Sequence, residues 1–117
     1  MNISKETEQK IARLQLLEQN LQNFLMQKQS LQTQLNEVSG AVEELKKSKG
    51  NVYKIVGNIM VLSEKNNLEK DLNSKKELIE LRIKNLEKQE EKIREEATEL
   101  QNEVLSKFKD EKQHEHE

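Results

Sequence analysis

The chain has no cysteine, no proline and no tryptophan, and its 117 residues include only three glycines, one tyrosine and two phenylalanines. Without cysteine there can be no disulfide framework and no thiolate metal site, which fits a reducing compartment. The glycines are scattered, so no glycine-rich loop is available to hold a phosphate. Long apolar runs are missing, and the amino terminus lacks a signal-peptide core. We therefore expect a cytoplasmic protein that does not cross a membrane.

An excess of charge of one sign is also missing, because 20 basic and 22 acidic residues leave a net charge of -2. This balance gives no electrostatic footprint for nucleic acid or anionic lipid, so protein partners are expected. Charged residues make up 36% of the chain and hydrophobic residues 32%. This composition argues against a large compact core, and we expect the few apolar residues to lie along narrow seams if the chain folds.

Apolar residues in the first half recur alternately three and four residues apart, which is the spacing of a heptad seam. Lys28 is its one interior interruption, and towards the amino terminus the seam becomes polar. Ser4 is a candidate N-cap and Gly50 a candidate C′ glycine, so we expect a helix over about residues 4–49. The seam consists of Leu14, Leu17, Leu21, Phe24, Leu31, Leu35, Val38, Val42 and Leu45, and it continues backwards through Lys10, Thr7 and Ile3.

The second half repeats this spacing and predicts a helix over about residues 66–108. Asn66 is its candidate N-cap, with Glu69 three positions further on, and a solvated tail is expected over about residues 109–117. The second seam consists of Leu72, Ile79, Ile83, Leu86, Ile93, Ala97, Leu100 and Val104, with interruptions at Lys76 and Glu90.

Folding the second helix back antiparallel to the first would place Leu45 near Leu72 and the interrupting Lys28 opposite Glu90. A charged layer of this kind costs stability but fixes the register of a coiled coil. The expected fold is therefore mainly α, a single domain over residues 1–117. It consists of a long antiparallel two-helix coiled coil with one central β-hairpin.

The hairpin is predicted by a β-rich run at residues 52–63 that interrupts the heptads. Gly57 and Asn58 form its expected turn, because glycine supplies the positive φ that two-residue turns require. This register would place Tyr53 opposite Leu62 and leave both faces mainly apolar. The candidate assembly residues are Val52, Tyr53, Ile55, Val56, Gly57, Ile59, Met60, Val61 and Leu62.

A two-stranded hairpin is marginal in water by itself and leaves two strand edges unpaired. We therefore expect other chains to supply the missing strands. The alternative is that the chain's own helices cover both faces of the hairpin. Helices that lead away from a hairpin can cover little of it, which favours the intermolecular sheet.

Some apolar residues near the two chain ends lie off the seams and have no obvious partner within the chain. They are interpreted either as a wider core stripe or contact between neighbouring coils, or as exposed surface that holds unfolded protein. On the second interpretation the candidate client-binding residues at the coiled-coil tips combine off-seam residues with the seam residues beside them. The off-seam residues are Ile11, Leu16, Leu105 and Phe108, and the seam residues are Leu14, Leu17, Leu100 and Val104.

No arrangement of residues indicates catalysis, a cofactor or a functional metal site. A heptad seam and a small hairpin do not provide a concave site that excludes water. His114 and His116, with the neighbouring Glu115 and Glu117, lie in the expected tail, where no fixed ligand shell is predicted. We expect a protein that is not an enzyme.

Five segments are informative beyond the heptads: Val52 to Val61, Gln27-Lys28-Gln29, Glu43-Glu44-Leu45, Leu81 to Lys84 and Glu87 to Glu90. Together they resemble an archaeal prefoldin β subunit, and the eukaryotic prefoldin subunit 6 is similar. The resemblance implies a hexamer of two α and four β subunits, with hairpins forming a β-barrel body from which six coiled coils hang. It also implies ATP-independent capture of unfolded proteins at the tips and their delivery to a group II chaperonin. A single hairpin fits the β class, since α-class subunits have two.

Two features of the sequence limit what the resemblance implies. The acidic, histidine-containing tail departs from the family pattern and leaves the contacts of the carboxyl terminus open. The heptads alone would suit a structural coiled-coil scaffold without chaperone activity equally well, so this remains the competing interpretation.

Overall fold

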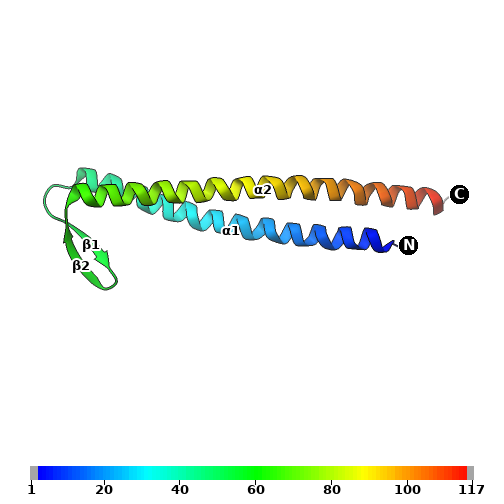
Figure 1. The fold of residues 1–117 in the computed structure, drawn as a ribbon, viewed down its shortest axis with the longest axis horizontal. Helices are drawn as coiled ribbons and strands as arrows, with labels where there is room; N and C mark the ends of the chain where they lie inside the picture. The colour runs from blue at the N-terminus through cyan, green and yellow to red at the C-terminus, as the bar shows by residue number, and fades with distance from the viewer. Residues whose placement is uncertain (1–2, 116–117) are drawn as a thin grey trace. The chain divides into compact units, whose positions relative to one another are not determined.

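The computed structural model describes the backbone of residues 3–115 and the side chains of residues 3–110. Four elements follow one another: helix α1 (Lys5–Lys47), strands β1 (Val52–Val56) and β2 (Ile59–Ser63), and helix α2 (Lys65–Glu115) (Figure 1). Two long helices with an antiparallel hairpin between them confirm the expected fold class, while barrel formation between subunits stays a prediction.

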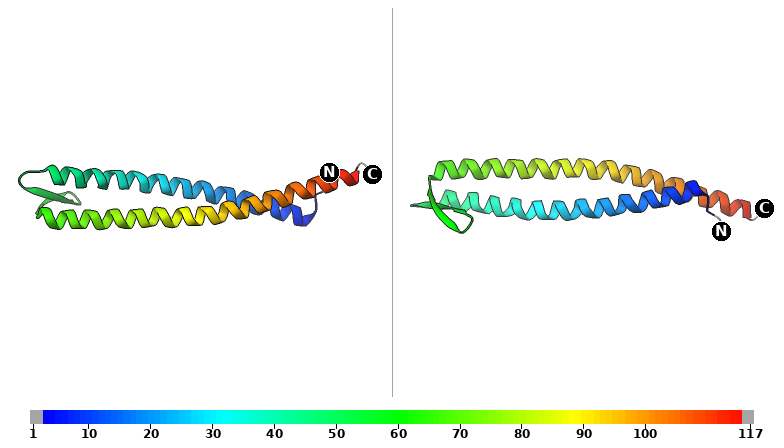
Figure 2. Two further views of the ribbon diagram at one scale, coloured as in Figure 1. Left: turned by 90° about the horizontal axis from the view of Figure 1, so that it is seen from above. Right: turned by 60° about the horizontal axis from the view of Figure 1, so that its bottom comes forward.

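The chain divides into two compact units, each with a segment of both helices. The hairpin unit is Lys28–Asn85, and the terminal unit is Met1–Gln27 together with Leu86–Glu117. Figure 2 shows that within each unit the α1 and α2 segments lie side by side and run in opposite directions. Across residues 3–115, neither helix combines the length and the apolar character needed to span a membrane.

Helix α1 begins at the predicted cap. The backbone N–H of Thr7 donates to Ser4 Oγ at 3.1 Å, and the N–H of Glu8 donates to the Ser4 carbonyl at 3.0 Å. Ser4 Oγ thus provides an acceptor for the Thr7 N–H, which has no partner within the helix, and the Ser4 carbonyl accepts the first bond of the helical ladder. Glu6 and Glu8 in that turn also complement the positive end of the helix dipole.

The end of α1 differs slightly from the expectation. The helix ends at Lys47, two residues before the predicted Lys49, and the N–H of Ser48 donates to the Leu45 carbonyl at 3.3 Å. This bond to the third residue back tightens the last turn and closes the helix early. Gly50 has the left-handed φ of 108° but lies beyond the cap, in the segment that leads to β1.

The hairpin has the predicted register. Tyr53 pairs with Leu62, Ile55 with Met60, and Val52 with Ser63. Gly57 has a φ of 61°, the left-handed conformation that a tight two-residue turn needs and that glycine adopts without steric cost.

Helix α2 differs from the prediction at both ends. It begins at Lys65, and Glu64 occupies the cap position because its carbonyl accepts the Leu68 N–H at 2.9 Å; the predicted cap Asn66 lies inside the helix. At the other end the helix continues to Glu115 rather than ending near residue 108. Residues 109–115 contain no glycine or proline and include lysine, glutamate and glutamine, which are good helix formers. This part of the expected tail is therefore helical.

The two units bury different kinds of residue. In the hairpin unit the buried side chains are apolar: Val38, Val42, Leu45, Val52 and Ile79. In the terminal unit Leu17 and Val104 are buried together with the polar Thr7 and the charged Glu90. Apart from Val52, these residues lie at positions of the predicted seams, with Thr7 in the polar extension of the first seam and Glu90 at an interruption of the second. Heptad spacing therefore identified the packed helix faces.

Candidate functional site

The most exposed apolar surface lies on the hairpin. Ile55 is 72% exposed, and Ile59 and Met60 are each 66% exposed. Removal of apolar side chains from water lowers the free energy of the system. An exposed cluster of this kind therefore usually marks an interaction site. We call this surface the hairpin patch, and it consists of Tyr53, Ile55, Val56, Ile59, Met60, Val61 and Leu62.

The hairpin patch occupies both faces of the two-stranded sheet. Side chains alternate between faces along a strand, so the register places Ile55 and Met60 on one face and Val56 and Ile59 on the other. All of them are exposed, although the same unit contains segments of both helices. The chain's own helices therefore leave both faces uncovered, which contradicts the alternative that they enclose the hairpin.

The strand edges are also open within the chain. The sheet has only β1 and β2 over residues 3–115, so each strand has one outer edge. The outward N–H and C=O groups of such an edge are a template for pairing with a further strand. The hairpin thus offers apolar faces and backbone hydrogen-bonding groups in the same place.

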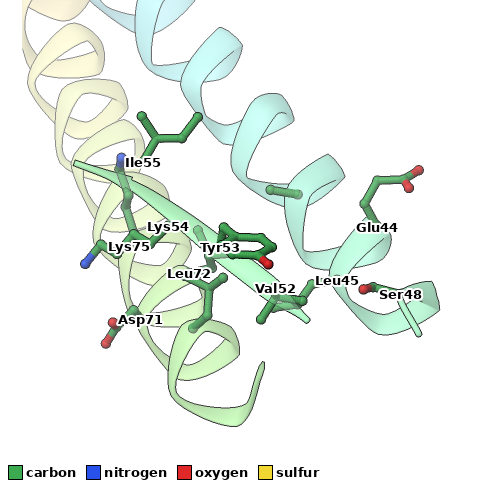
Figure 3. Close-up of a pocket in the computed structure, with 12 residues that line it drawn as sticks. Glu44, Leu45, Ser48, Val52, Tyr53, Lys54, Ile55, Asp71, Leu72 and Lys75 are labelled. Carbon is green, nitrogen blue, oxygen red and sulfur yellow. The ribbon is translucent and has the colours of Figure 1, made fainter. Parts of the chain in front are cut away.

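The base of the hairpin is anchored to its own unit. Val52, the first residue of β1, is only 9% exposed. Beneath β1 is a hollow of about 770 Å³ between the strand and the two helix segments, with Tyr53, Leu45 and Leu72 among its walls (Figure 3). The full lining is Ala41, Glu44, Leu45, Ser48, Val52, Tyr53, Lys54, Ile55, Leu68, Asp71, Leu72 and Lys75. Leu45 and Leu72, which the antiparallel alignment predicted to be neighbours, both line it.

The eight candidate client-binding residues of the terminal unit divide by burial. Leu17 and Val104 are buried, at 1% and 7% exposure, so their surface packs within the chain. Leu16 and Leu105 are exposed, at 48% and 52%. The other four, which are Ile11, Leu14, Leu100 and Phe108, are half-buried. A surface that could receive another polypeptide therefore includes Leu16, Leu105 and the uncovered parts of the last four.

Ion pairs join the helix segments of the terminal unit. Lys10 Nζ lies 3.1 Å from Glu103 Oε2 and 3.6 Å from Glu6 Oε1, and Arg13 Nε lies 3.1 Å from Glu96 Oε1. The hydrogen bond to Glu103 is the main cause that raises the pKa of Lys10 above its ordinary 10.5. Sequence reasoning did not identify these pairs. The polar continuation of the first seam at Lys10 was the available signal.

Glu90 is a charged residue within the terminal unit that is only 7% exposed. Its Oε1 atom accepts hydrogen bonds from Arg94 Nε at 3.1 Å and Arg94 Nη2 at 2.6 Å, one helical turn further along α2. The predicted pairing of Glu90 with Lys28 joins residues of different units and stays a prediction.

Metal ligands do not gather in the part of the molecule whose side chains are described. Over residues 3–110, no three His, Cys, Asp or Glu side chains are placed to hold a metal ion together. The side chains of His114 and His116, the candidates considered from sequence, lie outside the described residues.

Comparison with known proteins gives consistent matches. Residues 8–111 match the family described as prefoldin subunit. The prefoldin subunit beta of Saccharolobus islandicus is 39% identical over 108 residues, covering 88% of this chain and 86% of that protein. The prefoldin subunit beta of Archaeoglobus fulgidus is 44% identical over 93 residues, covering 78% and 80%. The crystal structure of the prefoldin beta subunit from Thermococcus strain KS-1 superposes with a TM-score of 0.84 at 33% identity, covering 90% of this chain and 94% of that chain.

Proposed function

This chain belongs to the prefoldin subunit family, and we propose that it acts as a β-type subunit of an α2β4 hexamer that captures unfolded polypeptides without ATP. Membership of the family implies a chaperone role, and family members assemble into complexes with other prefoldin subunits. The stoichiometry, the capture mechanism and the later steps are our proposal for this chain.

The exposed hairpin patch is the observation that carries the proposal. Seven apolar side chains between 47% and 72% exposed occupy both faces of one small sheet whose two edges are open. Strands from α subunits and other β subunits would cover these faces and pair with these edges, closing an intermolecular β-barrel. Burial of apolar area at roughly 25 cal/mol per Å² favours such an assembly.

The proposed client-binding surface lies on the terminal unit. Leu16 and Leu105 are exposed on different helices, and Ile11 and Phe108 are half-buried beside the seam. An unfolded chain presents apolar segments of varied shape, which scattered and adaptable apolar side chains can contact. We propose that these four residues contact client, while Leu17 and Val104 keep the two helix segments together.

We further propose that the assembled complex works in the cytoplasm and passes captured chains to a group II chaperonin. The support is the resemblance to prefoldin β subunits rather than a feature of the site. Neither a nucleic acid nor a membrane has a role in this proposal, because the chain carries a nearly balanced charge. No cofactor is required, and no enzymatic step is involved.

The decisive test mixes the full-length chain with a prefoldin α subunit and measures aggregation of a denatured client by light scattering without nucleotide. We expect suppression by the mixture near a one-to-one ratio of hexamer to client, and weaker suppression by either subunit alone. Native mass spectrometry of the same mixture should give two α and four β subunits. A complex of that mass that fails to suppress aggregation at several-fold excess would identify the chain as a structural scaffold.

A further inference from the structure

Lys65 forms two hydrogen bonds that bridge the base of the hairpin. Its Nζ atom lies 3.0 Å from the carbonyl oxygen of Ser48 and 3.4 Å from that of Lys46. Lys65 is the first residue of α2, whereas the two acceptors belong to the end of α1 and the residue after it. The bonds therefore join the segments that enter and leave the hairpin.

The position of Lys65 is unfavourable for the helix in which it lies. A helix N-terminus carries a partial positive charge that repels a lysine, and the first turn of α2 contains no acidic residue, although the cap residue Glu64 is acidic. The carboxyl end of α1 has the opposite property, because its last carbonyls lack partners within the helix and carry a partial negative charge. The ammonium of Lys65 supplies charge-assisted hydrogen bonds at this end. The position of Lys65 is therefore explained by its bonds to the end of α1 and not by the preference of the first turn of α2.

The carbonyls that Lys65 holds also belong to the support of the hairpin. Ser48 lines the hollow beneath β1, together with Val52 and Tyr53 (Figure 3). Only a short segment containing Gly50, at a φ of 108°, separates Ser48 from the first strand. Fixing Ser48 relative to the start of α2 therefore fixes the points from which both strands emerge.

We propose that Lys65 is a positioning residue that holds the hairpin in one orientation on its helices before partner chains bind. The inference rests on the proposed role of the hairpin in assembly, and it explains how two short strands are held in place for partner chains to bind. A two-stranded hairpin is marginally stable alone, and binding is strengthened when a surface is ordered beforehand. Removing the bonds should leave the hairpin attached but variable in orientation.

The test compares three full-length variants: Lys65→Met removes the bonds, Lys65→Arg keeps a charged donor, and Lys70→Met is the matched control. Lys70 is exposed on the same helix, so its replacement makes the same change of charge. Amide hydrogen exchange of residues 52–63 is measured before partner subunits are added. A cation at a helix carboxyl end contributes from a few tenths to about 2 kcal/mol, so exchange in Lys65→Met should be about two- to thirtyfold faster.

Two further readouts separate positioning from general destabilisation. Tyr53 is the only tyrosine and the chain has no tryptophan, so its fluorescence anisotropy reports hairpin mobility directly and should fall in Lys65→Met. Exchange in the interior of α2 should not increase, because the variant removes an unfavourable charge from that helix end. Lys65→Arg should restore most of the anisotropy, and Lys70→Met should behave as the unaltered chain does.

The association constant with an α subunit should fall in Lys65→Met by a factor similar to the increase in hairpin exchange. Unchanged hairpin exchange and anisotropy in Lys65→Met would overturn the inference, as would an equal effect of Lys70→Met. If the unaltered chain forms no complex with an α subunit, the proposed function is wrong. The exchange and anisotropy measurements would still decide the role of Lys65 in that case.

Discussion

The hairpin unit and the terminal unit differ in which side chains they bury and which they leave exposed. In the hairpin unit the helix seam is entirely apolar where it is buried, yet the attached sheet leaves seven large apolar side chains exposed. In the terminal unit the seam includes Thr7 and Glu90, and ion pairs link the two helix segments at its surface. The hairpin unit thus has a cluster of exposed apolar side chains on its sheet, whereas the terminal unit buries polar groups together with Leu17 and Val104.

This difference follows from geometry. A helix presents one stripe of side chains to one neighbour, so two helix segments can satisfy each other's seams. A strand presents side chains to both faces and backbone groups to both edges, and one hairpin cannot cover all of these. Apolar residues at the seam positions of the helices can therefore be buried within the chain, whereas most apolar residues of the hairpin stay exposed unless another chain covers them.

The strongest test of this comparison places a charge on each face of the hairpin. Ile55→Asp and Val61→Asp put a carboxylate where neighbouring strands are proposed to pack. Burial of an unpaired carboxylate should weaken association by at least about 3 kcal/mol, which is more than a hundredfold. We expect both variants to sediment as small species while the far-ultraviolet circular dichroism remains helical.

Asn58→Asp is the matched control, because it adds the same charge in the turn, where aspartate is well tolerated. It should assemble as the unaltered chain does. A sedimentation profile that neither Ile55→Asp nor Val61→Asp changes would remove the intermolecular sheet from the proposal.

The second test asks whether binding of client and assembly reside in different units. Replacing Ile11, Leu16, Leu105 and Phe108 by serine removes apolar contacts worth about 1.5–3 kcal/mol for each side chain that a client would bury fully, and less for partial burial. Client affinity should fall at least about tenfold, while the mass of the complex with an α subunit stays the same. Full-strength client binding would show that these residues serve only in packing.

A matched pair makes that test more specific. Leu16 and Leu105 are 48% and 52% exposed in the terminal unit, and Leu78 and Leu81 are 50% and 54% exposed in the hairpin unit. The double serine variants remove the same side-chain type at nearly equal exposure. Client affinity should respond to the first double variant and not to the second, and equal losses would contradict a site confined to the terminal unit.

The sequence predicted those features that depend on local spacing. The two seams, the Ser4 cap and the hairpin register each follow from a few neighbouring residues, and the structure has them. The neighbouring of Leu45 and Leu72 also followed from the antiparallel alignment, but individual polar contacts between distant residues were not predicted. The Lys65 bonds begin at a position where local preference disfavours lysine, and the Lys10–Glu103 pair joins residues far apart in sequence. Periodicity placed Leu17 and Val104 on the seams, where they are buried, and only their place near the chain ends suggested client binding.

A further test concerns the residues that pack the terminal unit. Leu17 is 1% exposed and its neighbour Leu16 is 48% exposed, so two adjacent leucines differ mainly in burial. Leu17→Ala should lower the free energy of unfolding by about 2–3 kcal/mol, the lower part of the range for buried leucine, because two helices enclose a side chain less completely than a globular core. Leu16→Ala should lower it by less than about 0.5 kcal/mol. Thermal unfolding of both variants checks the difference, and similar losses would show that the buried seam does not hold this unit together.

The smallest expected effect concerns the ion pair between Lys10 and Glu103. The hydrogen bond to Glu103 raises the pKa of Lys10 above 10.5, so folding favours the charged lysine. This stabilisation is fully present below pH 10.5 and is lost as the pH rises through the raised pKa. Lys10→Gln should therefore lower the unfolding midpoint slightly and equally at every pH near neutrality, and less in high salt, which screens an exposed pair. At strongly alkaline pH its midpoint should converge with that of the unaltered chain.

Lys107→Gln, an exposed change in the same unit, is the control. A loss larger than that of Leu17→Ala, or one that persists at alkaline pH, would show that Lys10 acts through packing of its methylene groups rather than through its charge.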